Sequence, residues 1–186
     1  MERVLWCVIT SGLLLATAAF SQEELFVPAN DVSFTVATER STYRVGEQID
    51  LKYEIVNISN ADLYIPREWE AQCPTKPHVW AGFETSSGKH LIPGYAGSCS
   101  PSPQTVTERM RKEAVLLKPG ERFEGTVKMD TTLFGGLKSG SYRLEATLSG
   151  WSESEFSPAQ QSEMAKLGAP FMRGDVPAST RIRLIP

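Results

Sequence analysis

The stretch from Tyr43 to Pro66 alternates apolar and polar residues almost without interruption and breaks only at residues 57–60, Asn-Ile-Ser-Asn. Side chains alternate between the two faces of a strand, so this pattern predicts a strand with one buried face. We expect residues 57–60 to form an exposed turn that includes the glycosylation sequon at Asn57, and residues 62–66 to form the returning strand. The residues expected on the buried face are Val45, Ile49, Leu51, Tyr53 and Ile55.

The same alternation recurs along the chain and predicts an all-β protein. A Ser87-Gly88 turn joins residues 78–84 to 89–93, and a Pro-Gly turn at 119–120 ends another strand. About eight strands at this spacing favour an antiparallel, immunoglobulin-like β-sandwich. The other alternating segments are 32–36, 114–118, 123–129, 142–148 and 180–184.

One short helix is expected before the last strand. Ser157 is a suitable N-cap, Pro158 suits the first helical position, Gln160 completes a capping box, and Gly168 ends the helix. This helix lies in an excursion of about residues 150–176 that is longer than a sandwich connection requires. The excursion is either a lid over one open edge or a functional insertion.

The first 21 residues have the layout of a secretory signal peptide. A charged start precedes an apolar run that ends at Phe20, and Ala19-Phe20-Ser21 is a suitable cleavage site, with residues 16–18 as a second choice. An uncleaved membrane anchor is the alternative, although the run is short for a spanning helix. Removing 21 of the 186 residues leaves 165, which suits a single domain at 22–186. We therefore expect an exported protein, periplasmic or extracellular, with no membrane contact after cleavage.

Cysteine usage agrees with export, and the charge bears on the partner. Once Cys7 is removed with the signal, Cys73 and Cys99 form an even pair, and an oxidising compartment favours one disulfide between them. Both would lie at the open end of the hairpin that turns at Ser87-Gly88. The net charge of −3 comes without a basic patch, so we expect no nucleic-acid partner.

Three segments carry a resemblance to a known family: residues 43–65, the Leu-Lys-Pro-Gly-Glu run at 117–121, and residues 136–148 with the pattern Leu137-x-x-Gly140-x-Tyr142. They are similar to the immunoglobulin-like modules of exported bacterial proteins, in particular the non-catalytic N-terminal domain of deuterolysin-like zinc metalloproteases. A weaker likeness is to the bacterial intracellular proteinase inhibitor domain. The resemblance implies a sandwich in which the hydroxyl of Tyr142 bonds back across a corner. The His-Glu-x-x-His motif of the metalloprotease is absent.

The sequence offers little for catalysis. Its two histidines, His78 and His90, fall on opposite arms of one hairpin, offset by about four to seven residues, so they should not share a metal. We expect each to be exposed or half-buried. Glu68 and Glu70 flank Trp69, but nothing places them across a glycosidic bond. We therefore predict a protein that is not an enzyme and carries no cofactor or metal.

Aromatic residues around the two cysteines are the strongest sign of function. Trp69, Trp80 and Tyr95 flank loops that the disulfide would hold rigid, and rigid loops with exposed aromatic rings bind partners in many sandwich domains. The alternative is that these rings close the end of the core. The first functional hypothesis is a non-enzymatic binding or accessory module for an unknown protein or ligand of the cell envelope or medium. The second is a protease-inhibitor-like protein that presents an extended segment near residues 100–107. The candidate surface is Trp69, Trp80, Tyr95, Pro101 and Pro103.

Overall fold

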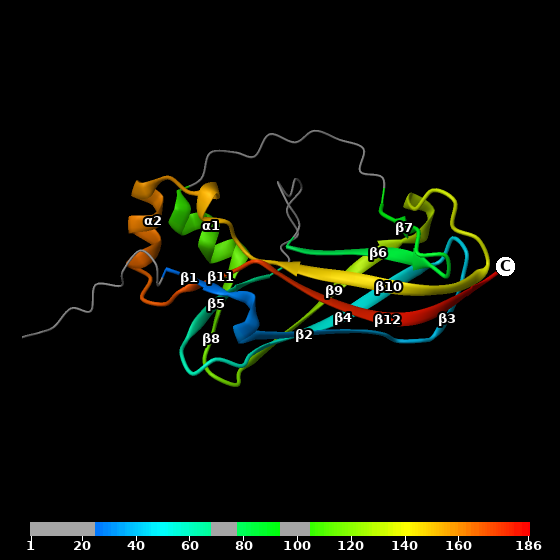
Figure 1. Cartoon of the computed structure of the whole chain (residues 1–186), viewed down its shortest axis with the longest axis horizontal. Coiled ribbons are helices and arrows are strands. Elements are labelled where there is room, and N and C mark those ends of the chain that lie inside the picture. Colours follow the sequence, from blue (N-terminus) through cyan, green and yellow to red (C-terminus); the bar gives the residue numbers. More distant parts are fainter. Residues whose placement is uncertain (1–24, 68–77, 94–104) are drawn as a thin grey trace, which may run out of the picture.

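A computed structural model describes residues 25–67, 78–93 and 105–186. The signal segment and the cysteine pair, Cys73 and Cys99, lie outside these residues, so both stay predictions. Within them the chain is mostly β-structure arranged in three sheets (Figure 1). The strands are β1 Phe26–Pro28, β2 Val32–Thr38, β3 Thr42–Arg44, β4 Gln48–Asn57, β5 Leu63–Pro66, β6 Val79–Thr85, β7 His90–Leu91, β8 Ala114–Leu117, β9 Arg122–Asp130, β10 Gly140–Ser149, β11 Phe171–Arg173 and β12 Asp175–Ile185.

Two of the sheets enclose the main core. One has the order β2-β4-β9, and the other has the order β3-β12-β10-β6-β7. Alternate residues of both sheets enter the core, and Ile49, Leu51, Ile55, Leu144 and Leu148 are completely buried there. The predicted β-sandwich is therefore confirmed as a class, and the alternation located its buried faces. Val45 is the exception, because it lies in the turn before β4 and is exposed.

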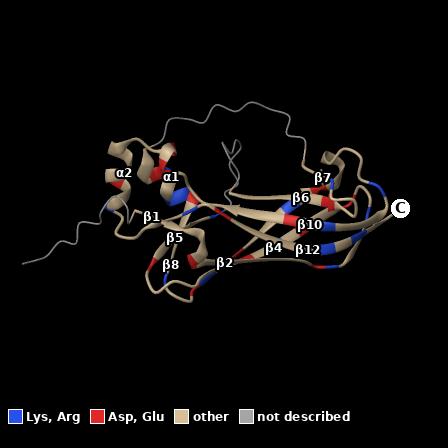
Figure 2. Cartoon of the chain, in the orientation of Figure 1, with Lys and Arg blue, Asp and Glu red and all other residues tan. Residues whose placement is uncertain are grey.

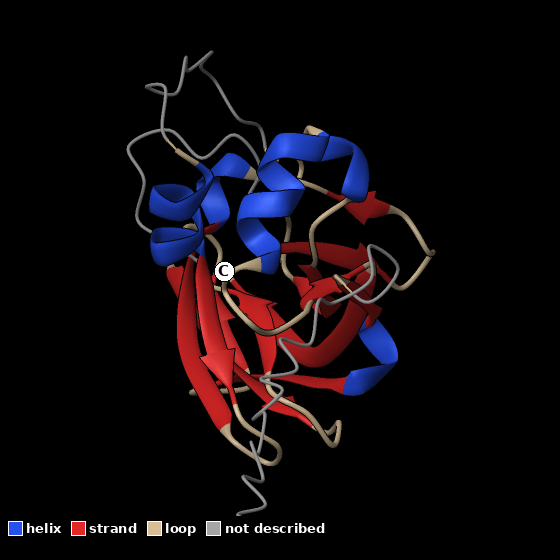
Figure 3. Cartoon of the chain, turned by 90° about the vertical axis from the view of Figure 1, so that its left-hand side faces the viewer, coloured by secondary structure: helices blue, strands red, loops and turns tan. Residues whose placement is uncertain are grey.

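The third sheet, β1-β11-β5-β8, lies with two helices at one end of the molecule (Figures 1 and 3). The helices are α1, Val106–Glu113, and α2, Pro158–Ala165, and they pack against each other. A second apolar cluster fills this end, with Trp151 and Phe171 buried at its centre. The short 3-10 turns η2 Ala29–Asp31, η3 Thr131–Leu133 and η4 Glu153–Glu155 complete the described elements.

The prediction that the chain turns at residues 57–60 and returns beside β4 is wrong. Residues 63–66 form a strand, β5, but it pairs with β8 and β11 and not with β4. The neighbours of β4 are β2 and β9. The turn therefore carries the chain out of one sheet and into another. The sequon at Asn57 is not exposed either: Asn57 is completely buried, and its side-chain amide donates to the carbonyls of Ala61 and Leu117, both at 2.8 Å.

The helix predicted before the last strand is confirmed as α2. Ser157 and Gln160 form the capping box, and Pro158 is the first helical residue. The excursion that contains α2 also supplies β11, which pairs in parallel with β1 and β5. It is thus an integral wall of the second apolar cluster. The sequence prediction missed α1, although Thr105 and Glu108 form a capping box that the sequence already displays.

A tyrosine corner fixes the entry to β10. The hydroxyl of Tyr142 donates to the carbonyl oxygen of Lys138 at 2.9 Å and accepts from its N–H at 3.1 Å. This is the bond across the corner that the Leu137-x-x-Gly140-x-Tyr142 pattern implied. It holds the start of β10, the strand at the centre of the five-stranded sheet.

Candidate functional site

The outer face of the five-stranded sheet carries a groove beside Trp80. The alternation that buries Ala81 and Phe83 turns Trp80 and Glu84 of β6 outward, and the neighbouring strands contribute their own outward residues. The hollow has a volume of about 320 Å³. It is lined by Trp80, Gly82, Phe83, His90, Leu91, Ile92, Arg143, Glu145, Ala146, Thr147, Pro177, Ala178 and Ser179.

Strand register arranges the outward residues of this face in three rows. Trp80, Thr147 and Pro177 lie side by side across β6, β10 and β12 and form a mostly apolar row. The next row is Gly82, Glu145 and Ser179, and the third is Glu84, Arg143 and Arg181. The face therefore changes from apolar to charged over four residues of strand, or roughly 13 Å at the rise of an extended chain.

Gly82 allows β7 and the residue that follows it to form one wall of the groove. A Cβ at position 82 would lie 2.9 Å from the carbonyl oxygen of Leu91, which is closer than side-chain carbons normally approach a backbone atom. Only glycine permits this approach. The next residue, Ile92, is 68% exposed, and Trp80 across the groove is 41% exposed. Two large apolar side chains thus remain accessible on the rim.

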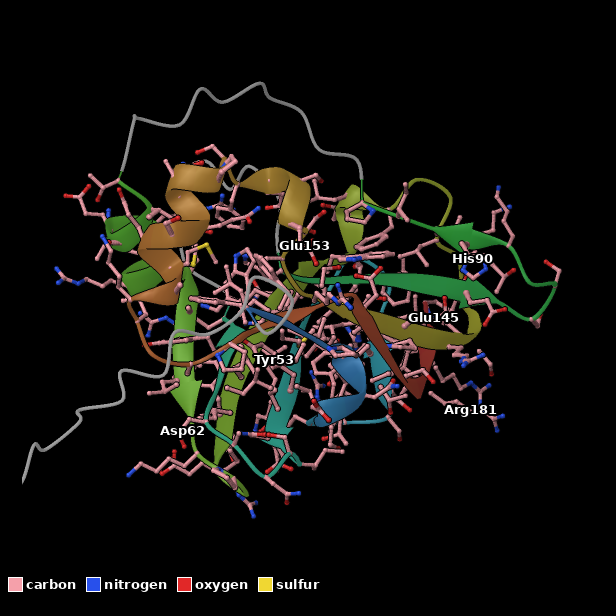
Figure 4. All side chains as sticks on the ribbon, turned by 60° about the vertical axis from the view of Figure 1, so that its left-hand side comes forward. Tyr53, Asp62, His90, Glu145, Glu153 and Arg181 are labelled. Carbon is pink, nitrogen blue, oxygen red and sulfur yellow. The ribbon has the colours of Figure 1, made fainter. Side chains whose placement is uncertain are left out.

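The charged part of the groove is a small network of ion pairs. His90 Nδ1 lies 2.9 Å from Glu145 Oε2, and Arg143 bridges Glu84 at 3.4 Å and Glu145 at 3.7 Å. Arg143 Nε also donates to Ser179 Oγ at 3.1 Å. Such exposed pairs contribute little to stability. Figure 4 shows His90, Glu145 and Arg181 on β7, β10 and β12 of this sheet, and Figure 2 shows both charge signs along β6, β10 and β12.

Trp80 is the one residue of the predicted binding surface that the structure describes. Its side chain is 41% exposed on the outer face of the sheet, and its role in binding stays a prediction. Trp69, Tyr95, Pro101 and Pro103 lie outside the described residues and stay predictions. The extended segment predicted near residues 100–107 is wrong for its last residues. Thr105 is the N-cap of α1, and Val106 is a buried helical residue.

The two predicted histidines have different outcomes. Glu84, six residues beyond His78, lies opposite His90, which agrees with the predicted offset. His90 is exposed, as expected. The prediction for His78 is wrong: His78 is buried, with Nδ1 2.9 Å from the carbonyl oxygen of Ser149 and its ring edge-on to Trp151.

His78 belongs to a second polar cluster, which joins α1 to the sheet. His78 Nε2 lies 3.6 Å from Glu113, and Glu113 accepts from Arg109 Nε at 2.7 Å. Burial raises the pKa of the Glu113 carboxyl, but the interactions with His78 and Arg109 outweigh it and leave that pKa below its ordinary value of 4.5. Trp151 Nε1, beside this cluster, is buried and has no hydrogen-bond partner among the described residues.

Sequence analysis missed the groove residues on β10 and β12. The signal was present, because the residues between Tyr142, Leu144 and Ala146 are Arg143 and Glu145, whose parity places them on the outer face. What the sequence could not show is which strands are neighbours. Within the described residues, no group of three or more His, Cys, Asp or Glu side chains could hold a metal ion. No helix there is long and apolar enough to cross a membrane.

Comparisons with known proteins give no family. No family model and no curated protein matches the chain. Among solved structures, a β-glucosidase from Erythrobacter marinus is 13% identical with a TM-score of 0.40, and the match covers 83% of this chain but 15% of the enzyme. The CARDB domain of the PF1109 protein from Pyrococcus furiosus, solved with di-metal ions, is 11% identical, with a TM-score of 0.36 and coverage of 83% and 88%.

A PapD-like domain of human CEP192 is also similar, at 13% identity and a TM-score of 0.34, with coverage of 97% of this chain and 100% of that domain. At these scores the matches carry no argument about what this chain binds or does.

Proposed function

We propose that the protein is an exported, non-enzymatic binding module whose contact surface is the groove beside Trp80. The observation that carries the proposal is the pairing of an exposed apolar rim, Trp80 and Ile92, with a charged row on the same face. Exposed tryptophan and arginine side chains are the residues that most often dominate binding energy in protein interfaces. The export half of the proposal rests on the signal-like residues 1–21.

The strand order supports an immunoglobulin-like topology. The orders β2-β4-β9 and β12-β10-β6-β7 correspond to strands A-B-E and G-F-C-C′ of that fold, and β3 adds to β12 in parallel. The resemblance to the N-terminal domain of deuterolysin-like proteases, and the weaker one to the inhibitor domain, stay predictions from sequence motifs. No described residue favours protease inhibition over a general binding role.

The partner that fits this face is an extended protein segment with an apolar side chain and an acidic side chain. The apolar side chain would pack on Trp80 and Pro177. The acidic one would meet the third row, where Arg143 and Arg181 are register partners and Arg181 has no ion pair with any described residue. Because the two ends of the face are roughly 13 Å apart, the two side chains should be about four residues apart in an extended chain.

The experiment is a titration of the mature chain against synthetic peptides in which the spacing between one Trp or Leu and one Asp or Glu is varied. Binding should be strongest at a spacing of about four residues, and Trp80→Ala and Arg181→Glu should each weaken it about tenfold or more. Leu116→Ala is the matched control, because Leu116 is 40% exposed but lies on β8, away from the groove. Equal losses in all three variants, or no dependence on spacing, would refute the proposal.

A further inference from the structure

In the part of the chain that the structure describes, strand β9 is paired along one edge only. It is the last strand of the sheet β2-β4-β9, and its partner there is β4. At the opposite end of this sheet β2 lies against β12, and β9 in turn approaches β6 of the other sheet without pairing with it. Among the described residues, nothing is hydrogen-bonded to the outer side of β9 along its nine residues. An open strand of this length is a template for another strand.

The alternation of backbone hydrogen bonds between β4 and β9 identifies the residues of β9 whose N–H and C=O groups point to the open edge. The N–H of Asn57 donates to the carbonyl oxygen of Glu121 at 3.1 Å, so residues 121 and 57 form a bonded pair. Bonded pairs alternate along an antiparallel ladder, which makes 123, 125, 127 and 129 the residues whose backbone groups face β4. The residues whose N–H and C=O point away from β4 are Arg122, Glu124, Thr126, Lys128 and Asp130, and all five side chains are exposed.

The charges of these five residues are self-complementary. In chain order they are positive, negative, neutral, positive and negative. If a second β9 lies antiparallel with Thr126 opposite Thr126, each Glu124 faces Lys128 of the other copy and each Arg122 faces Asp130. Opposite charges in directly opposed positions stabilise a strand pair, and like charges destabilise it.

Other registers with the same hydrogen-bond phase lose this match. A shift in one direction places Arg122 opposite Lys128, and a shift in the other places Glu124 opposite Asp130. Larger shifts oppose Glu124 to itself or Lys128 to itself. Among registers that pair five or more residues of the strand, only the one centred on Thr126 leaves no like-charge pair, and it is also the only one that pairs all nine residues.

The inward side of the strand fits the same register. There Phe123 would face Met129 of the other copy, which sets two apolar side chains against each other, and Gly125 would face Val127. Phe123 and Val127 are only half-buried in the single chain, since they lie at the open edge of the core. Pairing would cover both, which adds apolar burial to the new backbone hydrogen bonds.

We propose that this edge binds a second copy of the chain through antiparallel β9–β9 pairing about a twofold axis at Thr126. The two three-stranded sheets then form one continuous six-stranded sheet with an isologous interface. The groove beside Trp80 lies on the other sheet and is not used, so the dimer would present two grooves. This inference is independent of the proposed function.

Charge reversal with heterodimer rescue tests the register. The mature wild-type chain should sediment as a dimer at about 100 µM, whereas Lys128→Glu and Glu124→Lys, each alone, should weaken association about tenfold or more because each creates two like-charge pairs. An equimolar mixture of the two variants should restore the dimer, because every opposed pair is again of opposite sign. Lys166→Glu, at the exposed C-cap of α2, is the control and should leave the dimer unchanged.

A cysteine at the axis gives a second readout. Bonded antiparallel residues have Cα atoms about 5.5 Å apart, within the range of a disulfide. Thr126→Cys should therefore link to itself between copies under mild oxidation, and Glu124→Cys should not, as peptide mass mapping would show. A monomeric wild type, absence of rescue in the mixture, or equal cross-linking at both positions would overturn the proposal.

Discussion

The ring of Tyr53 lies directly across Gly125, its register partner on the neighbouring strand. A Cβ at position 125 would overlap the ring and hydroxyl of Tyr53. The tyrosine is almost completely buried and also packs beside Phe34 and Phe123. Because Gly125 has no side chain, the ring of Tyr53 on β4 can pack against the backbone of β9 on the core side of the sheet.

Gly125→Ala should destabilise the fold by about 2 kcal/mol, because the added methyl group forces the packed ring out of position. Gly135→Ala is the matched control: it also adds one methyl group, but nothing lies within 4 Å of that position and its φ is not positive. Urea unfolding measures both. In a Tyr53→Ala background the cost of Gly125→Ala should largely disappear, and strict additivity of the two changes would contradict this account.

The alternation in the sequence was sufficient to find the strands of the main core and their buried faces. It worked because β4 and β10 each have one buried face and one face that is partly or fully exposed to solvent. Apolar and polar residues therefore alternate along most of each strand. The alternation could not show whether residues 63–66 pair with β4 in a hairpin or, as β5 does, join a different sheet. Pairing partners depend on long-range packing, and the turn at residues 57–60 has the same local chemistry in either case.

The second apolar cluster was beyond this kind of argument for a different reason. α1 buries only Val106 and Met110, one turn apart, so it shows too little periodicity to stand out from a loop. Its capping box was visible, but a capping box without an apolar run is a weak signal. For the groove, the sequence supplied Trp80 but not the residues of β10 and β12 that surround it, because their adjacency follows from the register.

The lowered pKa of Glu113 predicts a pH-dependent stability. A carboxyl whose pKa is lower in the folded than in the unfolded chain stabilises the fold above its ordinary value of 4.5, and this contribution is lost as the pH falls through the folded-state pKa. Glu113→Gln should therefore cost about 1 kcal/mol at pH 7, and the difference from wild type should shrink as the pH falls below 4.5. Urea unfolding at pH 7 and at pH 3 measures it.

The control for this change is Glu163→Gln on α2, where the side chain is exposed and has no ion pair with a described residue. It should have the same small effect at both pH values. If Glu113→Gln were neutral at pH 7, the link between Arg109, Glu113 and His78 would not be holding α1 against the sheet.

Asn57 offers the sharpest test of the connection between the two sheets. Its amide nitrogen donates to the carbonyls of Ala61 and Leu117, and its amide oxygen accepts from the N–H and hydroxyl of Ser59 at 3.0 and 2.7 Å. All of its side-chain polar groups are thus satisfied inside the protein. Asn57→Asp keeps the shape but turns the donor into an acceptor, which places a carboxylate against two carbonyl oxygens.

We expect Asn57→Asp to cost about 3 kcal/mol at neutral pH, since a buried charge would lose its partners. The loss should be smaller at low pH, because a protonated aspartic acid regains one donor. Ser59→Ala removes only the hydroxyl partner and should cost about 1 kcal/mol. Asn60→Asp is the matched control, because it makes the same chemical change at an exposed position of the same turn. Equal unfolding free energies for Asn57→Asp and Asn60→Asp would show that the buried amide does not hold β4 to the start of β5 and the end of β8.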